Sequence, residues 1–297
     1  MSTNLRHAGF RAMGTYCEIQ LYEASRISAK RMVRQLIDEV SRLESKYTRY
    51  RDDSFLSAIN RSAGNQAGIK IDTETLKLFE HARTCYEQSD ELFDITAGAL
   101  RRVWDFSRRQ VPDESELEGL LPLIGYEKLN WRDDTLLMPA NMEIDFGGIV
   151  KEYAADTLAT LARELGVRRG LINLGGDYAA IGTQPENRPW PIGITHPEDS
   201  AQMMSHFHLS EGGLASSGDY ERSFIFEGKR YSHLLNPKTG WPCSGLRAVS
   251  VAANLCTVAG SFATIAMLKP EQDAINWLTD SGLPFVFMNG AGQIGGP

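Results

Sequence analysis

The order in which strand and helix patterns follow one another is the feature that most constrains this fold. Apolar residues recur every three to four positions in residues 25–46 and again in residues 150–165, which predicts two amphipathic helices. Short β-prone runs stand between such helices, and residues 223–226, closed by Glu227 and Gly228, predict a hairpin. This irregular alternation favours an α+β fold with a largely antiparallel sheet over a doubly wound parallel sheet. Without repeats or a linker, residues 1–297 are expected to form one domain with lobes.

Composition argues against several classes of protein. A formal net charge of -7 disfavours a nucleic-acid surface, because phosphate backbones are bound by basic faces. The four cysteines are scattered and form no Cys-x-x-Cys pair, so neither a zinc site nor a disulfide framework is indicated. No apolar run approaches the roughly 18 residues of a membrane helix. The N-terminus has neither an apolar signal core nor a lipid-attachment cysteine, so a cytoplasmic protein is expected.

Three glycine-rich turns follow predicted strands, and each lies beside a carboxylate. They are residues 145–148, 175–177 and 217–219. The first opens a helix, where backbone N–H groups favour a phosphate, and Lys151 in the first helical turn adds positive charge. None matches Gly-x-Gly-x-x-Gly, so a Rossmann dinucleotide site is not indicated. Taken singly, each is more often a tight turn that needs a positive φ.

His233 is the strongest candidate for proton transfer. It stands at a predicted strand end beside the turn at residues 236–240, where an imidazole can remove a proton from an acceptor hydroxyl. A lone histidine is nevertheless more often structural. Trp104 and Phe106 can stack on a planar ring, although aromatic residues at this spacing more often belong to a core.

Assembled in order, these motifs resemble those of the ApbE family, the FAD:protein FMN transferases. Each segment alone is weakly specific, but their order and spacing together are strongly so. The matching segments are residues 13–15, 50–60, 93–98, 145–156, 173–177, 217–222 and 233–240.

The resemblance implies a T-fold-like α+β domain that binds FAD in a cleft. With Mg²⁺, such a protein moves the FMN half of FAD onto a Thr or Ser hydroxyl of a target flavoprotein, and AMP leaves. His233 corresponds to the base. The implied FAD contacts are Met13, Tyr50, Trp104, Asp105, Phe106, Asp145, Lys151, Asp177 and, through its backbone, Leu235.

The metal site implied by the resemblance departs from the family pattern. Thr264 and the Gly148 carbonyl match its ligands, but Gly260 stands where the main carboxylate belongs, four residues before Thr264 on one helix face. Glu152 is a second departure, because many members have glycine there, and its charge would oppose a pyrophosphate unless it points away. Two alternatives therefore remain: an FAD pyrophosphatase that yields FMN and AMP, or a non-catalytic FAD-binding protein.

Overall fold

The computed structural model describes residues 4–199, 201–220 and 222–297. Its centre is an eight-stranded sheet in the order β1-β2-β6-β7-β10-β13-β14-β15, and every pairing in it is antiparallel. The α+β prediction is therefore confirmed. The strands are β1 Asn4–Ala12, β2 Thr15–Glu23, β6 Gly170–Leu174, β7 Asp177–Gly182, β10 Gly213–Gly218, β13 Ala248–Ala253, β14 Phe285–Met288 and β15 Ile294–Gly295.

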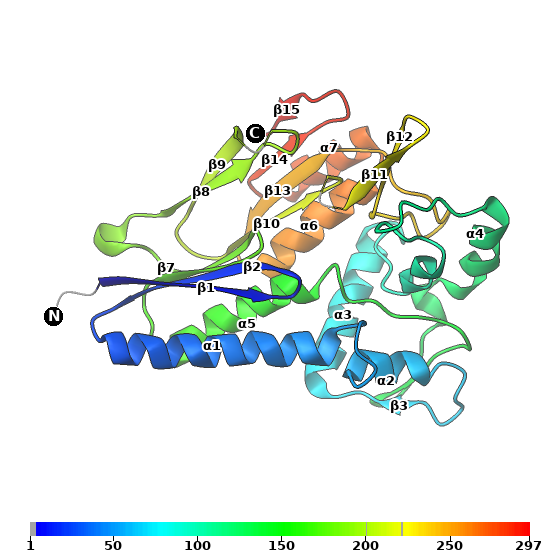
Figure 1. The fold of residues 1–297 in the computed structure, drawn as a ribbon, viewed down its shortest axis with the longest axis horizontal. Helices are drawn as coiled ribbons and strands as arrows, with labels where there is room; N and C mark the ends of the chain where they lie inside the picture. Colours follow the sequence, from blue (N-terminus) through cyan, green and yellow to red (C-terminus); the bar gives the residue numbers. More distant parts are fainter. Residues whose placement is uncertain (1–3, 200, 221) are drawn as a thin grey trace.

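One face of the sheet is covered by three helices (Figure 1). The helices are α1 (Arg26–Tyr47), α5 (Val150–Glu164) and α6 (Cys256–Leu268), and α7 (Glu271–Ser281) packs beside α6. The predicted stripe on α1 is buried at Met32, Leu36, Val40 and Leu43. The two-stranded ribbon β8 (Trp190–Thr195) and β9 (Met203–Leu209) closes a second, smaller core.

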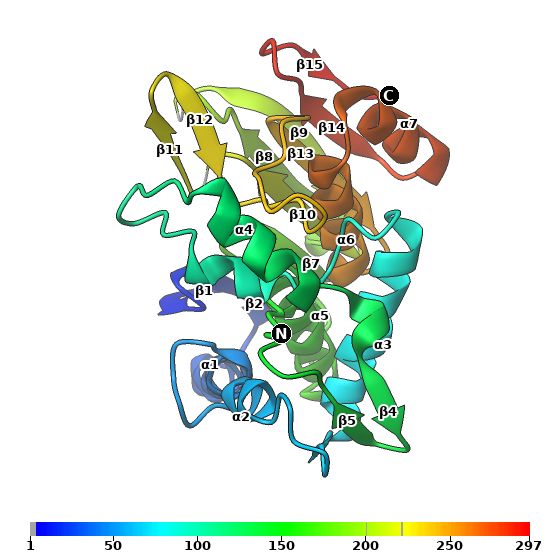
Figure 2. The same ribbon diagram turned by 90° about the vertical axis from the view of Figure 1, so that its right-hand side faces the viewer.

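The remaining helices and strands lie at one end of the sheet (Figure 1) and face the viewer in Figure 2. The predicted hairpin is confirmed there as β11 and β12, turned by Glu227 and Gly228 at φ 49° and 77°. The remaining elements are α2 Phe55–Arg61, α3 Thr73–Gln88, α4 Glu114–Leu120, β3 Ile69–Lys70, β4 Asn130–Arg132, β5 Thr135–Leu137, β11 Ser223–Phe226 and β12 Lys229–Ser232. In the part of the chain that the structure describes, no helix is long and apolar enough to cross a membrane.

Asp156 on α5 forms hydrogen bonds to the first residues of α6. Its carboxylate accepts hydrogen bonds from the backbone N–H groups of Cys256 and Thr257, each at 2.8 Å, and from the Thr257 hydroxyl at 2.7 Å. A helix begins with unpaired N–H groups, so this side chain from another helix acts as a cap.

We expect Asp156→Asn to lower the free energy of unfolding by about 1–3 kcal/mol, because hydrogen bonds to a charged acceptor are lost and an NH₂ group then faces N–H donors. Urea denaturation measures this change. The exposed Asp273 on α7 offers the matched control Asp273→Asn, for which we expect little change. Equal stability of the Asp156 variant and the parent would contradict the capping role.

Candidate active site

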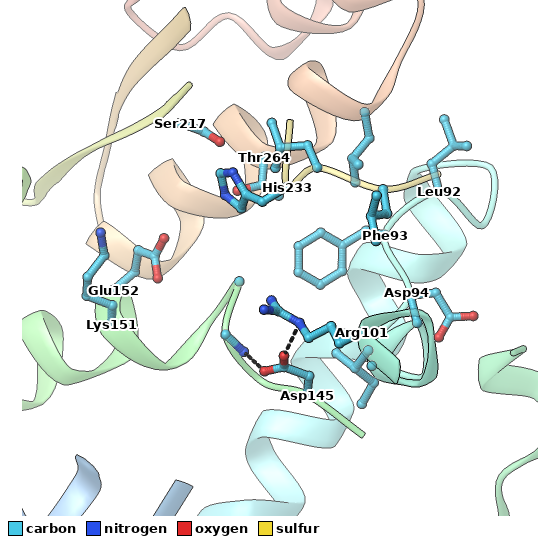
Figure 3. Close-up of a pocket in the computed structure, with 18 of the residues that line it drawn as sticks. Leu92, Phe93, Asp94, Arg101, Asp145, Lys151, Glu152, Ser217, His233 and Thr264 are labelled. Carbon is cyan, nitrogen blue, oxygen red and sulfur yellow. Dashed lines mark hydrogen bonds and ion pairs between the residues drawn. The ribbon is translucent and has the colours of Figure 1, made fainter. Parts of the chain in front are cut away.

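A cavity opens where the loop before α5, the segment after β12, the end of β10 and one side of α6 meet (Figure 3). Its remaining wall is formed by residues 92–95 and 97 together with Gly98 and Arg101 of the 3₁₀ helix Gly98–Arg102. Six of the residues predicted from the sequence line this cavity. They are Asp145, Gly148, Lys151, His233, Leu235 and Thr264.

The structure places Trp104, Asp105 and Phe106 outside the wall of this cavity. Trp104 is 3% exposed, donates its indole N–H to the Gly240 carbonyl at 2.8 Å and stacks on Phe106 with ring centroids 5.6 Å apart. Asp105 accepts hydrogen bonds from the backbone N–H groups of residues 107 and 108. In the structure Trp104 and Phe106 belong to a small core beneath β11 and β12, and Asp105 forms a turn. Their contacts with FAD stay a prediction.

Met13 and Tyr50 also lie outside the cavity wall, at the end of α1. The Met13 N–H donates to the Glu44 carboxylate at 2.8 Å, which fixes the β1–β2 turn against α1. Tyr50 is 75% exposed, and the Arg49 guanidinium lies 4.9 Å from its ring centroid. An exposed aromatic ring of this kind can stack on a planar ligand, and in the structure the Arg49 guanidinium lies against it.

Asp177 lies behind the cavity rather than on its wall. It is 1% exposed, and its carboxylate is 2.9 Å from the Lys151 ammonium. Burial raises the pKa of Asp177, while the charge of Lys151 opposes that rise. The geometry makes Asp177 a residue that positions Lys151 on the cavity wall.

Arg101 is a cavity residue that the sequence reasoning missed. Its guanidinium lies 2.9 Å from the Asp145 carboxylate, which also accepts the Gly147 N–H at 2.8 Å. Arg49 approaches the same carboxylate at 3.8 Å. Two adjacent arginines, Arg101 and Arg102, are a basic signal in the sequence. The structure shows which of them matters here: Arg101 lines the cavity, whereas Arg102 pairs with Glu143.

His233 is held in an apolar and cationic setting. Burial, followed by the charges of Arg222, Arg101 and Lys151, lowers its pKa to about 4. Its Nδ1 atom is buried and has no hydrogen-bond partner among the described residues. At neutral pH the imidazole is therefore neutral and able to accept a proton.

This shift gives a prediction for the ligand-free protein. His233 should protonate near pH 4 rather than near 6.5, the value of an unperturbed histidine. Because the pKa in the folded state is the lower one, the unfolded chain binds the proton first. The contribution of His233 to stability, up to about 3 kcal/mol, is complete above pH 6.5 and is lost as the pH falls toward 4. Histidine-selective NMR, assigned with His233→Asn, measures the midpoint, and a midpoint above 6 would contradict this setting.

Glu152 and Gly260, which face each other between α5 and α6, form the least expected contact of the site. Glu152 is 7% exposed, and it lines the cavity with Gly148 and Thr264 (Figure 3). A Cβ atom placed on Gly260 would lie 2.5 Å from the Glu152 Cγ atom and 2.8 Å from its Oε1 atom. The Glu152 side chain thus fills the volume that a side chain at position 260 would need, and it does not point away from the cavity.

The described residues contain no group of three or more His, Cys, Asp or Glu side chains placed to hold a metal ion. A metal ion can also be held by a single carboxylate together with a backbone carbonyl and a hydroxyl, and such a site would not contain three of those side chains. Such oxygen ligands suit Mg²⁺, which commonly binds through one or two carboxylates together with substrate phosphates and water. Glu152, Gly148 and Thr264 offer these three kinds of oxygen around one cavity.

Comparison with known proteins gives a consistent result. A sequence model of the ApbE family matches residues 13–287. The chain is 26% identical to an FAD:protein FMN transferase of Vibrio cholerae over 274 residues, covering 90% of this chain and 82% of the relative. It is 30% identical to one of Klebsiella pneumoniae over 236 residues, covering 77% and 71%. The crystal structure of the ApbE protein from Thermotoga maritima superposes with a TM-score of 0.91 at 27% identity, covering 99% of this chain and 97% of the other.

Proposed function

This chain belongs to the ApbE family, and we propose on that basis that it transfers the FMN half of FAD to a Thr or Ser hydroxyl of a target flavoprotein, with release of AMP. The proposal is carried by one observation: the half-buried His233, whose buried Nδ1 atom has no hydrogen-bond partner among the described residues, lines the same cavity as two cations, Lys151 and Arg101. A dianionic pyrophosphate beside a hydroxyl acceptor requires both kinds of group.

The proposed reaction is a displacement at phosphorus. The acceptor oxygen bonds to the phosphorus of the FMN half, the bond from that phosphorus to the bridging oxygen breaks, and AMP leaves with the bridging oxygen. The proton of the acceptor hydroxyl passes to His233. Phosphoryl transfer depends mainly on positioning and on neutralising charge, which are the roles of Lys151, Arg101 and the N-terminus of α5.

Mg²⁺ belongs to this proposal as a group that Gly148, through its carbonyl, and Thr264, through its hydroxyl, would help to hold. Bound there, it would supply charge neutralisation at the phosphates. Asp145 anchors Arg101, and Asp177 anchors Lys151, so two of the predicted FAD contacts act on the substrate through the cations that they orient.

The test is to mix the purified protein with FAD, Mg²⁺ and a flavin-acceptor domain. The intact mass of the acceptor should rise by one FMN unit, and AMP should appear in equal amount by chromatography. AMP and FMN without a mass change would identify a pyrophosphatase. Binding of FAD with neither product would identify a non-catalytic FAD-binding protein.

A further inference from the structure

We propose that Glu152 supplies the carboxylate ligand of the metal site, in place of the carboxylate that the family places at position 260. The carboxylate would then come from α5 instead of α6. Gly260 leaves room for it because glycine has no side chain. The inference rests on FAD as the ligand proposed above, and its test is a measurement of metal binding.

The contact between the two helices carries the argument. Glu152 is the third residue of α5, and Gly260 is the fifth of the 13 residues of α6. A glycine within a helix costs about 1 kcal/mol relative to alanine, so its presence there calls for a packing reason. The 2.5 Å approach of a Cβ at position 260 to the Glu152 Cγ atom gives that reason. The two departures from the family pattern are thus one structural feature.

The position of Glu152 relative to the other oxygen ligands supports the same assignment. Thr264 follows Gly260 by four residues, so both lie on one face of α6. A carboxylate packed against Gly260 therefore lies on the same side of α6 as Thr264. Gly148 lies four residues before Glu152, in the loop that opens α5. Gly148, Glu152 and Thr264 all line the cavity.

Charge gives the third step. A carboxylate in the first turn of α5 is favoured by the helix dipole, but it opposes a pyrophosphate bound at the same helix end. A divalent cation between the Glu152 carboxylate and the phosphates converts this repulsion into two attractions.

The experiment measures FAD and Mn²⁺ binding to the full chain carrying Glu152→Gln. Mn²⁺ stands in for Mg²⁺, and its binding is followed by electron paramagnetic resonance in the presence of FAD. Changes of surrounding groups alone cost about 10- to 100-fold in metal affinity, so loss of a direct ligand should weaken Mn²⁺ binding at least about tenfold. Without metal, FAD should bind the variant as tightly as the parent or more tightly, because a negative charge has been removed. If Glu152 had only a structural role, Glu152→Gln would not weaken Mn²⁺ binding while preserving or strengthening the binding of FAD without metal.

Two further variants complete the test. Glu164→Gln removes an exposed carboxylate at the far end of α5 and should leave both affinities unchanged. The double variant Glu152→Gly with Gly260→Asp restores the family arrangement and should recover Mn²⁺ affinity. Undiminished Mn²⁺ binding by Glu152→Gln, or no Mn²⁺ binding by the parent, would overturn the assignment. Metal binding that depends on Glu152 without FMN transfer would instead refute only the proposed function.

Discussion

Replacing His233 with asparagine should reduce the rate of FMN transfer by about 10²- to 10⁴-fold, the usual contribution of a general base. The affinity for FAD should change much less, because the phosphates are held by the cations and the helix N-terminus. A single-turnover time course of acceptor mass measures the rate, and flavin fluorescence measures binding.

His206→Asn is the matched control, since His206 is exposed on β9 and lies outside the cavity wall. It should transfer FMN at the parental rate. Transfer by His233→Asn within a few-fold of the parent would remove His233 from the reaction and leave the hydroxyl proton to another acceptor.

Lys151→Met should lower the free energy of unfolding by about 3 kcal/mol or more. The substitution leaves the Asp177 carboxylate buried without its 2.9 Å partner, and an uncompensated buried charge is strongly destabilising. FAD affinity should fall as well, because the cavity wall loses a cation. Urea denaturation and fluorescence titration measure the two effects.

The pH dependence of this variant has a definite sign. Burial already raises the pKa of Asp177, and removing Lys151 takes away the charge that opposes the rise. A carboxyl whose folded pKa lies above its unfolded value binds its proton preferentially in the folded state, so stability falls as the pH rises through the folded pKa. The loss caused by Lys151→Met should therefore be smaller near pH 4 than near pH 8.

The double variant Lys151→Met with Asp177→Asn removes both charges. It should recover much of the stability and lose the pH dependence, while FAD affinity remains low. A single Lys151→Met variant that is as stable as the parent at neutral pH would show that the buried pair contributes little.

Local patterns in the sequence were sufficient for the elements that frame the site. The spacing of Met32, Leu36 and Val40 predicts α1, because a buried stripe must recur with the helical period. The Glu227-Gly228 turn predicts the β11–β12 hairpin for a similarly local reason, since both residues take a positive φ. The ordered motifs also sufficed for the family, which the comparisons then showed.

The sequence could not show which side chains contact one another in the folded protein. The aromatic and acidic residues at 104–106 satisfied the family motif, yet in the structure they form a core and a turn. Arg101 and Arg102 are adjacent in the chain, but they point to different carboxylates because of the twist of a short 3₁₀ segment.

By itself, then, the sequence determined the fold class, the order of the motifs and the presence of a histidine suited to proton transfer, because periodicity, turns and residue chemistry are written locally. Only the tertiary structure decided that Lys151 rests on Asp177 and that Glu152 occupies the space above Gly260. These partners are far apart in the chain, and they meet because the sheet brings α5 against α6 and β7. The two departures from the family motif, Glu152 and Gly260, are thus explained by one contact between neighbouring helices.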